Sequence, residues 1–157
     1  MKFLFLAIGK THEPYVKNGV EEFTGRLDKY FKTGWQLIAA PKNAASLPEP
    51  EQVRREGELI LAQLSKDDYL VALEETGTMM SSEGLAKFIQ ARANDNTRQI
   101  VFLIGGAFGL DDAVLKRANL KWSLSDLVFP HQLVRLILAE QVYRACTILK
   151  NEKYHHK

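Results

Sequence analysis

The chain has 157 residues, of which 46% are hydrophobic and 25% charged, with a formal net charge of +2. This composition is typical of a globular protein, and the length predicts one domain over residues 1–157 that buries about two-thirds of its unfolded surface. The net charge is too small to indicate a nucleic-acid partner by itself. The segment from His131 to Lys157 is more basic, which makes it either a candidate phosphate-facing surface or a solvated tail.

The single cysteine, Cys146, excludes an intrachain disulfide and lies within an apolar helical pattern, which favours buried packing over catalysis. The apolar N-terminal run that ends at Ile8 resembles part of a signal peptide. It is too short to span a membrane and has no small-residue cleavage site before Lys10, so a buried strand is the better interpretation. We therefore expect a cytoplasmic protein without a membrane partner.

Apolar periodicity and turn residues predict an alternation of strands and helices along the whole chain. In chain order we expect a strand at Lys2–Ile8, a helix at Pro14–Phe31, a strand at Trp35–Ala40, a proline-rich loop at Pro41–Pro50, a helix at Glu51–Leu64, a strand at Tyr69–Leu73, a helix from Ser81 or Ser82 to about Ala93, a strand at Gln99–Ile104, a helix at Asp111–Ala118, a strand beginning at Trp122–Leu124 and a helix at Gln132–Lys150.

This alternation predicts an α/β fold: a single domain with a mostly parallel sheet of five to six strands, flanked by helices. The run from Val101 to Ile104 has no polar alternation, which is typical of a strand covered on both faces.

The last helix is apolar around most of its circumference, with a thin polar stripe of Arg135, Glu140, Arg144 and Thr147. Glu140 and Arg144 are spaced i,i+4 in the favourable order for an ion pair. A helix with so wide an apolar surface must be covered on two sides. We therefore favour a homodimer, with complete burial inside one chain as the alternative.

Two loops are candidates for a binding site. One apolar run ends in Gly105-Gly106, and a second ends in Pro130-His131. If the two loops lie side by side, their peptide groups can bind a flat ligand such as an adenine ring without charged side chains. Taken alone, Gly105-Gly106 is equally compatible with an ordinary tight turn.

The sequence gives little support for other kinds of binding or catalytic site. Gly105-Gly106-x-x-Gly109 is not the dinucleotide-binding G-x-G-x-x-G, and it follows the fourth strand rather than the first, although Asp126 lies where a ribose-binding acid would be expected. The chain has no P-loop, no H-E-x-x-H, no C-x-x-C and no G-x-S-x-G motif. A metal site is not expected. An NAD-binding oxidoreductase and a dimeric RNA-binding module without catalysis stay open as alternatives.

Several segments together resemble a known family, and the resemblance covers the whole chain. The segments are Leu103-Ile104-Gly105-Gly106-x-x-Gly109-Leu110, Trp122-Ser123-Leu124-Ser125, Phe129-Pro130-His131-x-Leu133-Val134-Arg135, Glu140-Gln141-x-Tyr143-Arg144-Ala145 and the tail Tyr154-His155. They are similar to the ribosomal RNA large subunit methyltransferase H family, small SPOUT-type methyltransferases.

The resemblance implies methyl transfer from S-adenosyl-L-methionine to N3 of a pseudouridine in helix 69 of 23S rRNA, presented by the assembled ribosome. It also implies a homodimer in which the tail of one subunit helps to complete the site of the other. Finally, it implies a C-terminal trefoil knot. Knots are nearly absent from other folds, and neither composition nor periodicity predicts one.

The resemblance also assigns residues. Arg144, Tyr154, His155 and Lys157 are expected to contact RNA, and Tyr154 and His155 are the candidate catalytic residues, because the imide nitrogen must lose a proton. Arg135 is a further candidate phosphate contact. The family's tail has Arg or Lys after Tyr-His, whereas this chain has His156 followed by Lys157. The cofactor-binding set is Leu73, Gly105, Leu124, Ser125, Asp126, Leu127, Val128 and Phe129.

Overall fold

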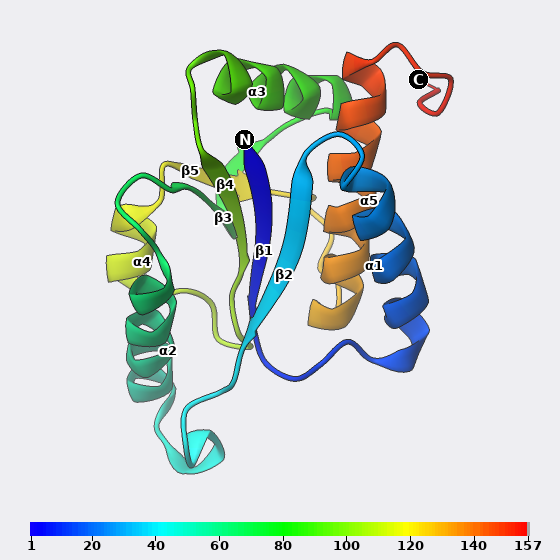
Figure 1. Ribbon diagram of the computed structural model, residues 1–157. Helices are drawn as coiled ribbons and strands as arrows, with labels where there is room; N and C mark the ends of the chain where they lie inside the picture. The colour runs from blue at the N-terminus through cyan, green and yellow to red at the C-terminus, as the bar shows by residue number, and fades with distance from the viewer. Residues whose placement is uncertain (157) are drawn as a thin grey trace.

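A computed structural model describes residues 1–156 and contains one parallel sheet of five strands in the order β2-β1-β4-β3-β5 (Figure 1). The strands are β1 (Lys2–Ile8), β2 (Lys32–Ile38), β3 (Tyr69–Met79), β4 (Gln99–Ile104) and β5 (Leu120–Ser123). The expected α/β fold with a parallel sheet is therefore confirmed.

Helices cover both faces of the sheet, with α1 and α5 on one side and α2 and α4 on the other (Figure 1). The helix α3 packs its buried residues into the same core as α1 and α5. No helix among residues 1–156 is long and apolar enough to cross a lipid bilayer. The helical segments are α1 (Pro14–Leu27), a short 3-10 turn (Ala44–Ser46), α2 (Glu49–Gln63), α3 (Ser82–Asn94), α4 (Asp112–Arg117) and α5 (His131–Leu149).

The strand β4 shows how the sheet separates two cores. Ile100 and Phe102 pack toward α1, α3 and α5, whereas Val101 and Leu103 pack toward α2 and α4. All four side chains are fully buried, because successive residues of a strand point to opposite faces and both faces are covered. The continuous apolar run therefore predicted the environment of β4 as well as its bounds.

Most other bounds differ from the prediction by a few residues. The strand β2 begins at Lys32 rather than Trp35, because Lys32 pairs in register with Lys2 of β1. The strand β3 continues past Leu73 to Met79 through an irregularity that contains Gly77. A Cβ atom at Gly77 would lie 2.6 Å from the carbonyl oxygen of Lys121, so only glycine allows β5 to approach here.

The helix α5 departs from the predicted polar stripe. Arg135 and Thr147 are buried, with exposed fractions of 2% and 0%. The helix packs against both α1 and α3, and Leu136 lies against Gly19 of α1. The need for cover on two sides is therefore met largely within one chain, and the apolar circumference of α5 alone does not require a second subunit.

Cys146 is buried in the core beside α1, as the sequence predicted, and burial raises the pKa of its thiol to about 12. A thiol with so high a pKa carries almost no thiolate at neutral pH and is a poor nucleophile. We expect the native protein at pH 7.5 not to react with a thiol reagent such as Ellman's reagent on the timescale on which the urea-unfolded protein reacts completely. Rapid modification of the native protein would contradict this burial.

Candidate functional site

A cavity of about 470 Å³ lies at the carboxyl edge of the sheet, where β4 and β5 end and β3 becomes irregular after Leu73. Its wall is formed by residues 73–75, 104–110, 122–125 and 127–129, and His131 and Val134 of α5 complete it. The two loops selected from the sequence therefore do lie side by side. Carboxyl ends of parallel strands are the usual position of ligand sites in α/β proteins, and the volume is that of a small-molecule site.

The wall combines apolar side chains with glycine backbone. Leu73 and Leu124 extend the main hydrophobic core up to the cavity. At the rim, Phe108, Leu127 and Val128 expose 48%, 71% and 90% of their surface. Exposed apolar residues gathered at the mouth of a cavity are typical of a binding surface rather than of a solvated loop.

Of the residues assigned to the cofactor by resemblance, seven line this cavity and one does not. Asp126 belongs to the same loop but is absent from the wall, whereas its neighbours Ser125 and Leu127 are part of it. The hydroxyl of Ser125 accepts a hydrogen bond from the N–H of Leu127 at 3.0 Å, which shapes this turn. The seven are Leu73, Gly105, Leu124, Ser125, Leu127, Val128 and Phe129.

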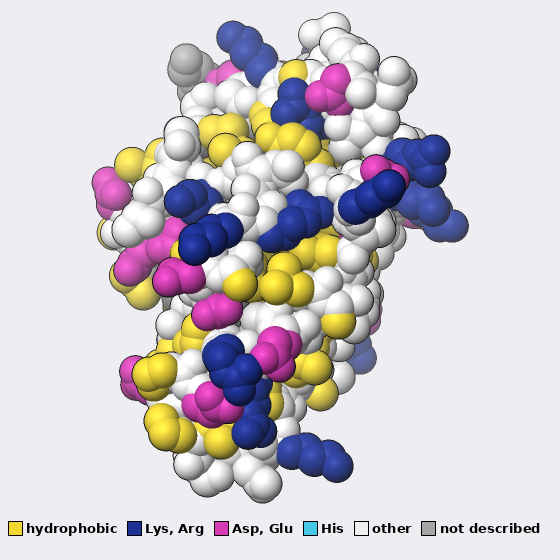
Figure 2. Space-filling view, turned by 90° about the vertical axis from the view of Figure 1, so that its left-hand side faces the viewer, with side chains coloured by type: hydrophobic (Ala, Val, Ile, Leu, Met, Phe, Trp, Pro, Cys, Tyr) yellow, Lys and Arg dark blue, Asp and Glu magenta, His cyan; other side chains and the backbone are white. Residues whose placement is uncertain are grey.

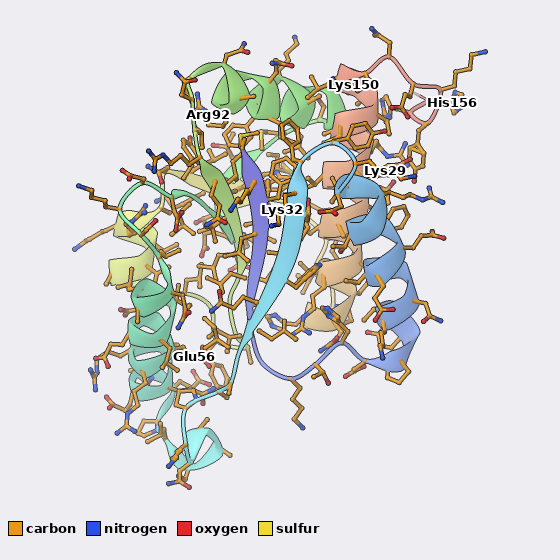
Figure 3. All side chains as sticks on the ribbon, in the orientation of Figure 1. Lys29, Lys32, Glu56, Arg92, Lys150 and His156 are labelled. Atoms are coloured by element: carbon orange, nitrogen blue, oxygen red, sulfur yellow. The ribbon has the colours of Figure 1, made fainter. Side chains whose placement is uncertain are left out.

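The loop that follows β4 and contains Gly105, Gly106 and Gly109, the glycine loop, packs against α2. The carboxylate of Glu56, only 4% exposed, lies so close to Gly106 that an added Cβ would be 2.6 Å from its Oε1 atom. At the next residue of α2, a Cβ on Gly57 would lie 2.9 Å from the Cβ of Asp111. Figure 3 labels Glu56 on α2, beside the lower part of the sheet. The segment from Gly106 to Asp111 is thus held at both ends by adjacent residues of one helix.

Gly106→Ala should destabilise the protein by about 1–3 kcal/mol, because the new methyl group meets the Glu56 carboxylate in a packed interior. Urea unfolding followed by circular dichroism would measure this change. The matched substitution Gly25→Ala, at a position of α1 with no atom within 4 Å of the added Cβ, should instead stabilise the protein by about 0.5–1 kcal/mol.

Adding Glu56→Ala to Gly106→Ala should recover part of the lost free energy of unfolding, since the two side chains compete for one space. Strictly additive effects in the double variant would contradict this contact.

The first turn of α5 fixes the loop between β1 and α1. The Arg135 guanidinium donates a hydrogen bond to the carbonyl oxygen of Lys10 at 2.8 Å, and Gln132 accepts one from the N–H of Glu13 at 2.9 Å. His12 packs beside Arg135, and burial together with the charge of Arg135 lowers the pKa of His12. The expectation that Arg135 contacts RNA phosphate is therefore wrong. An arginine inside an otherwise apolar helix was the signal for a buried structural role.

The C-terminal tail folds back on its own chain. The Tyr154 hydroxyl donates a hydrogen bond to Glu140 at 2.8 Å, and the Tyr154 ring packs against Tyr143 with centroids 4.8 Å apart. Glu140 also pairs with Arg144 at 2.8 Å, which confirms the i,i+4 pair expected from the sequence. Burial raises the pKa of Tyr154.

Both ring nitrogens of His155 have partners. Its Nδ1 lies 3.2 Å from the Arg144 guanidinium, and its Nε2 lies 2.8 Å from a carboxylate oxygen of Glu83 on α3. The Arg144 guanidinium also stacks over the Tyr154 ring at 4.8 Å. A guanidinium can only donate, so it occupies the Nδ1 lone pair and leaves the proton on Nε2, facing Glu83. The tail residues therefore form one ordered block on α3 and α5.

This block does not meet the cavity of its own chain. Arg144 is ten residues past Val134 on α5, so the two are separated by about 15 Å along the helix axis. The fold places Tyr154 and His155 against Arg144, but it places none of these three residues beside Gly105. Lys157, assigned to RNA by resemblance, lies outside the described residues. Within residues 1–156, no group of His, Cys, Asp and Glu residues could hold a metal ion.

Comparison with known proteins identifies the family. The family model described as predicted SPOUT methyltransferase matches residues 1–155. The chain belongs to the SPOUT methyltransferase family. SPOUT methyltransferases are known for a trefoil knot, so the knot expected from the resemblance follows from membership of the family.

Relatives of the same length support this assignment. The chain is 41% identical over 157 residues to the ribosomal RNA large subunit methyltransferase H of Christiangramia forsetii, with all of both chains covered. It is 44% identical over 156 residues to the protein of that name from Trichlorobacter lovleyi, covering 99% of this chain and all of the relative. For the Bacillus pumilus protein of that name, identity is 42% over 158 residues and 99% of each chain.

Proposed function

We propose that this SPOUT methyltransferase is a 23S rRNA (pseudouridine-N3)-methyltransferase, acting on a pseudouridine of helix 69. The cavity beside β3, β4 and β5 carries the proposal, because SPOUT methyltransferases need a methyl-donor site and this cavity has the volume of a small-molecule site. Relatives more than 40% identical over their full length carry the name ribosomal RNA large subunit methyltransferase H. We propose that residues 1–157 form one methyltransferase domain that works in the cytoplasm, where ribosomes lie.

The cavity fits S-adenosylmethionine, which when bound supplies an electrophilic methyl group. Leu73, Leu127 and Phe129 would offer apolar surface to an adenine ring, and the peptide groups of residues 104–106 and 124–128 would hydrogen-bond its polar edge. Leu110 packs directly over Gly105 and closes one side of the cavity. Most of the wall consists of apolar side chains and peptide backbone, which would hold and orient the donor, and Glu74, Glu75 and His131 are its ionisable side chains.

We assign removal of the proton from the acceptor nitrogen to the C-terminal tail, residues 154–157. His155 and Tyr154 are the proposed groups, and they lie on the far side of Arg144 from the cavity of their own chain. A second copy could present its docked tail to that cavity without unfolding it. In the described arrangement the Nδ1 lone pair of His155 faces Arg144, so a role as base requires RNA binding to draw Arg144 away.

We therefore expect a homodimer, with the exposed rim residues Phe108, Leu127 and Val128 inside or beside the interface. Light scattering at micromolar concentration should give twice the chain mass of 17.8 kDa. A monomer at the concentration at which the enzyme is active would leave the tail without a site to complete, and would contradict the shared-site proposal.

Mass mapping of 23S rRNA from cells with and without the gene tests the proposed function directly. We expect loss of one methyl group at a pseudouridine of helix 69 in the deletion strain, and its return when purified protein and S-adenosylmethionine are added to the deletion-strain ribosomes. An unchanged rRNA mass would reject the function. Binding of S-adenosylmethionine without methyl transfer would favour an RNA-binding module that has lost catalysis, and binding of NAD in its place would favour an oxidoreductase.

A further inference from the structure

We propose that the amino edge of the sheet, opposite the cavity, is a docking surface for the phosphate backbone of RNA. This inference rests on the proposed function and adds to it a second contact region, remote from the methylated base. Its basis is a row of cations where four neighbouring strands begin. In the spatial order of the sheet, the row is Lys32 of β2, Lys2 of β1, Arg98 before β4 and Lys66 before β3.

Pairing of the strands makes these residues neighbours. Lys32 and Lys2 are direct register partners, and the N–H of Lys2 donates a hydrogen bond to the carbonyl oxygen of Arg98 at 2.9 Å. Arg117, at the end of α4, lies beside Lys66, because its guanidinium donates to the carbonyl oxygens of Ser65 and Asp68 at 3.0 and 2.9 Å. The row therefore extends along the edge formed by β2, β1, β4 and β3.

The charges of the row are not neutralised by protein carboxylates. All four side chains are exposed, and within residues 1–156 none of them belongs to an ion pair. The buried carboxylate of Asp68 is instead occupied by the Gln99 side chain at 3.0 Å and the N–H of Ser65 at 2.9 Å. Cations on neighbouring strands repel each other, so an external anion would relieve a repulsion built into this edge.

Figure 2 shows Lys and Arg side chains in a band across the upper half of the side that carries α2 and α4. Figure 3 places Lys32 near the upper end of the sheet, well above Glu56.

The dimensions fit a polyanion rather than a single small anion. Neighbouring strands are about 4.8 Å apart, so four strands spread the row over roughly 14 Å. Double-stranded DNA carries about one phosphate per 1.7 Å of axis, and an RNA duplex is similarly dense in charge, so each phosphate contact by Lys or Arg releases a counterion. Four flexible side chains spaced in this way can meet several phosphates of one RNA helix without reading its sequence.

A matched pair of triple variants tests the surface. Lys2→Gln, Lys32→Gln and Lys66→Gln remove three cations from the row, whereas Lys17→Gln, Lys42→Gln and Lys87→Gln remove three exposed cations from elsewhere. Affinity for a transcribed RNA hairpin of the helix 69 sequence, and for unmethylated ribosomes, is measured between about 0.05 and 0.2 M salt, the range in which phosphate contacts are lost. Calorimetric affinity for S-adenosylmethionine is measured in parallel.

We expect the row variant to bind RNA at least tenfold more weakly at low salt, with a salt dependence reduced by about one unit of slope per lost contact. The control variant should stay within twofold of the wild type, and all three proteins should bind S-adenosylmethionine equally. Equal losses in both variants, or wild-type RNA affinity in the row variant, would overturn the docking surface.

The RNA titration also separates this inference from the proposed function, because it needs no methyl transfer. A wild type that binds RNA through the row but methylates no ribosome would reject the proposed function alone. A row variant that methylates ribosomes as well as the wild type would reject the docking surface alone. Binding of the row to anionic lipid vesicles but not to RNA would also overturn it.

Discussion

A folded Gly105→Val protein is expected to bind S-adenosylmethionine at least tenfold more weakly than the wild type. The reason is steric and indirect. A Cβ at position 105 would lie 2.7 Å from the Cδ2 atom of Leu110, which lines the cavity, so the valine must push Leu110 into the space that the cofactor needs. Overpacking of this kind costs about 1–3 kcal/mol, and about 1.4 kcal/mol corresponds to a tenfold change in affinity. Isothermal calorimetry measures the change.

Gly34→Val is the matched control, because no atom lies within 4 Å of an added Cβ at that position of β2. It should bind the cofactor as the wild type does. Adding Leu110→Ala to Gly105→Val should restore part of the affinity by removing the side chain that the valine displaces. Wild-type affinity in a folded Gly105→Val protein would show that the glycine loop is not part of the cofactor site.

Local sequence information was sufficient for the elements and for the position of the cavity. The apolar run before Gly105 predicted β4 with its bounds, because burial on both faces leaves a pattern without polar alternation. The two loops at Gly105 and before His131 could be placed side by side because parallel strands end at a common edge. Both inferences depend on neighbouring residues alone, which is the range over which periodicity carries information.

Contacts between distant segments could not be predicted in this way. The approach of Glu56 to Gly106 joins α2 to the loop after β4, and the hydrogen bond from Arg135 to Lys10 joins α5 to the loop after β1. From its sequence neighbours, Arg135 was expected on the polar side of a helix. It is buried only because α5 packs against α1 and the segment before it. The position of the tail on Glu83 and Arg144 depends likewise on where α3 crosses α5.

The row at the amino edge became visible only through strand order. Lys2, Lys66 and Arg98 are far apart in the chain, and none of them belongs to a local cluster of cations in the sequence. The sheet order brings them onto one edge, whereas the overall charge of +2 gives no sign of such a surface.

Deletion of residues 154–157 is expected to abolish methylation of ribosomes while leaving the fold and the cofactor affinity nearly intact. Tyr154 and His155 are more than a turn of helix beyond the cavity wall of their own chain, so their loss cannot disturb that wall directly. The stability should fall slightly, because the contact between the Tyr154 and Tyr143 rings is worth about 0.5–1.5 kcal/mol. Single-turnover methylation of unmethylated ribosomes is the measurement, with calorimetric cofactor affinity alongside.

Point substitutions identify which part of the tail acts. His155→Ala should lower the single-turnover rate at saturating ribosomes if His155 receives the proton, whereas Tyr154→Phe keeps the ring and removes only the hydrogen bond to Glu140. Stacking of Tyr154 on an unpaired base would be worth about 1–3 kcal/mol, so Tyr154→Ala should weaken ribosome binding far more than Tyr154→Phe. Lys153→Ala, an exposed neighbour, is the control. If the truncated enzyme methylates ribosomes at the full-length rate, the tail belongs to no active site, and proton removal must be assigned to the RNA or to solvent.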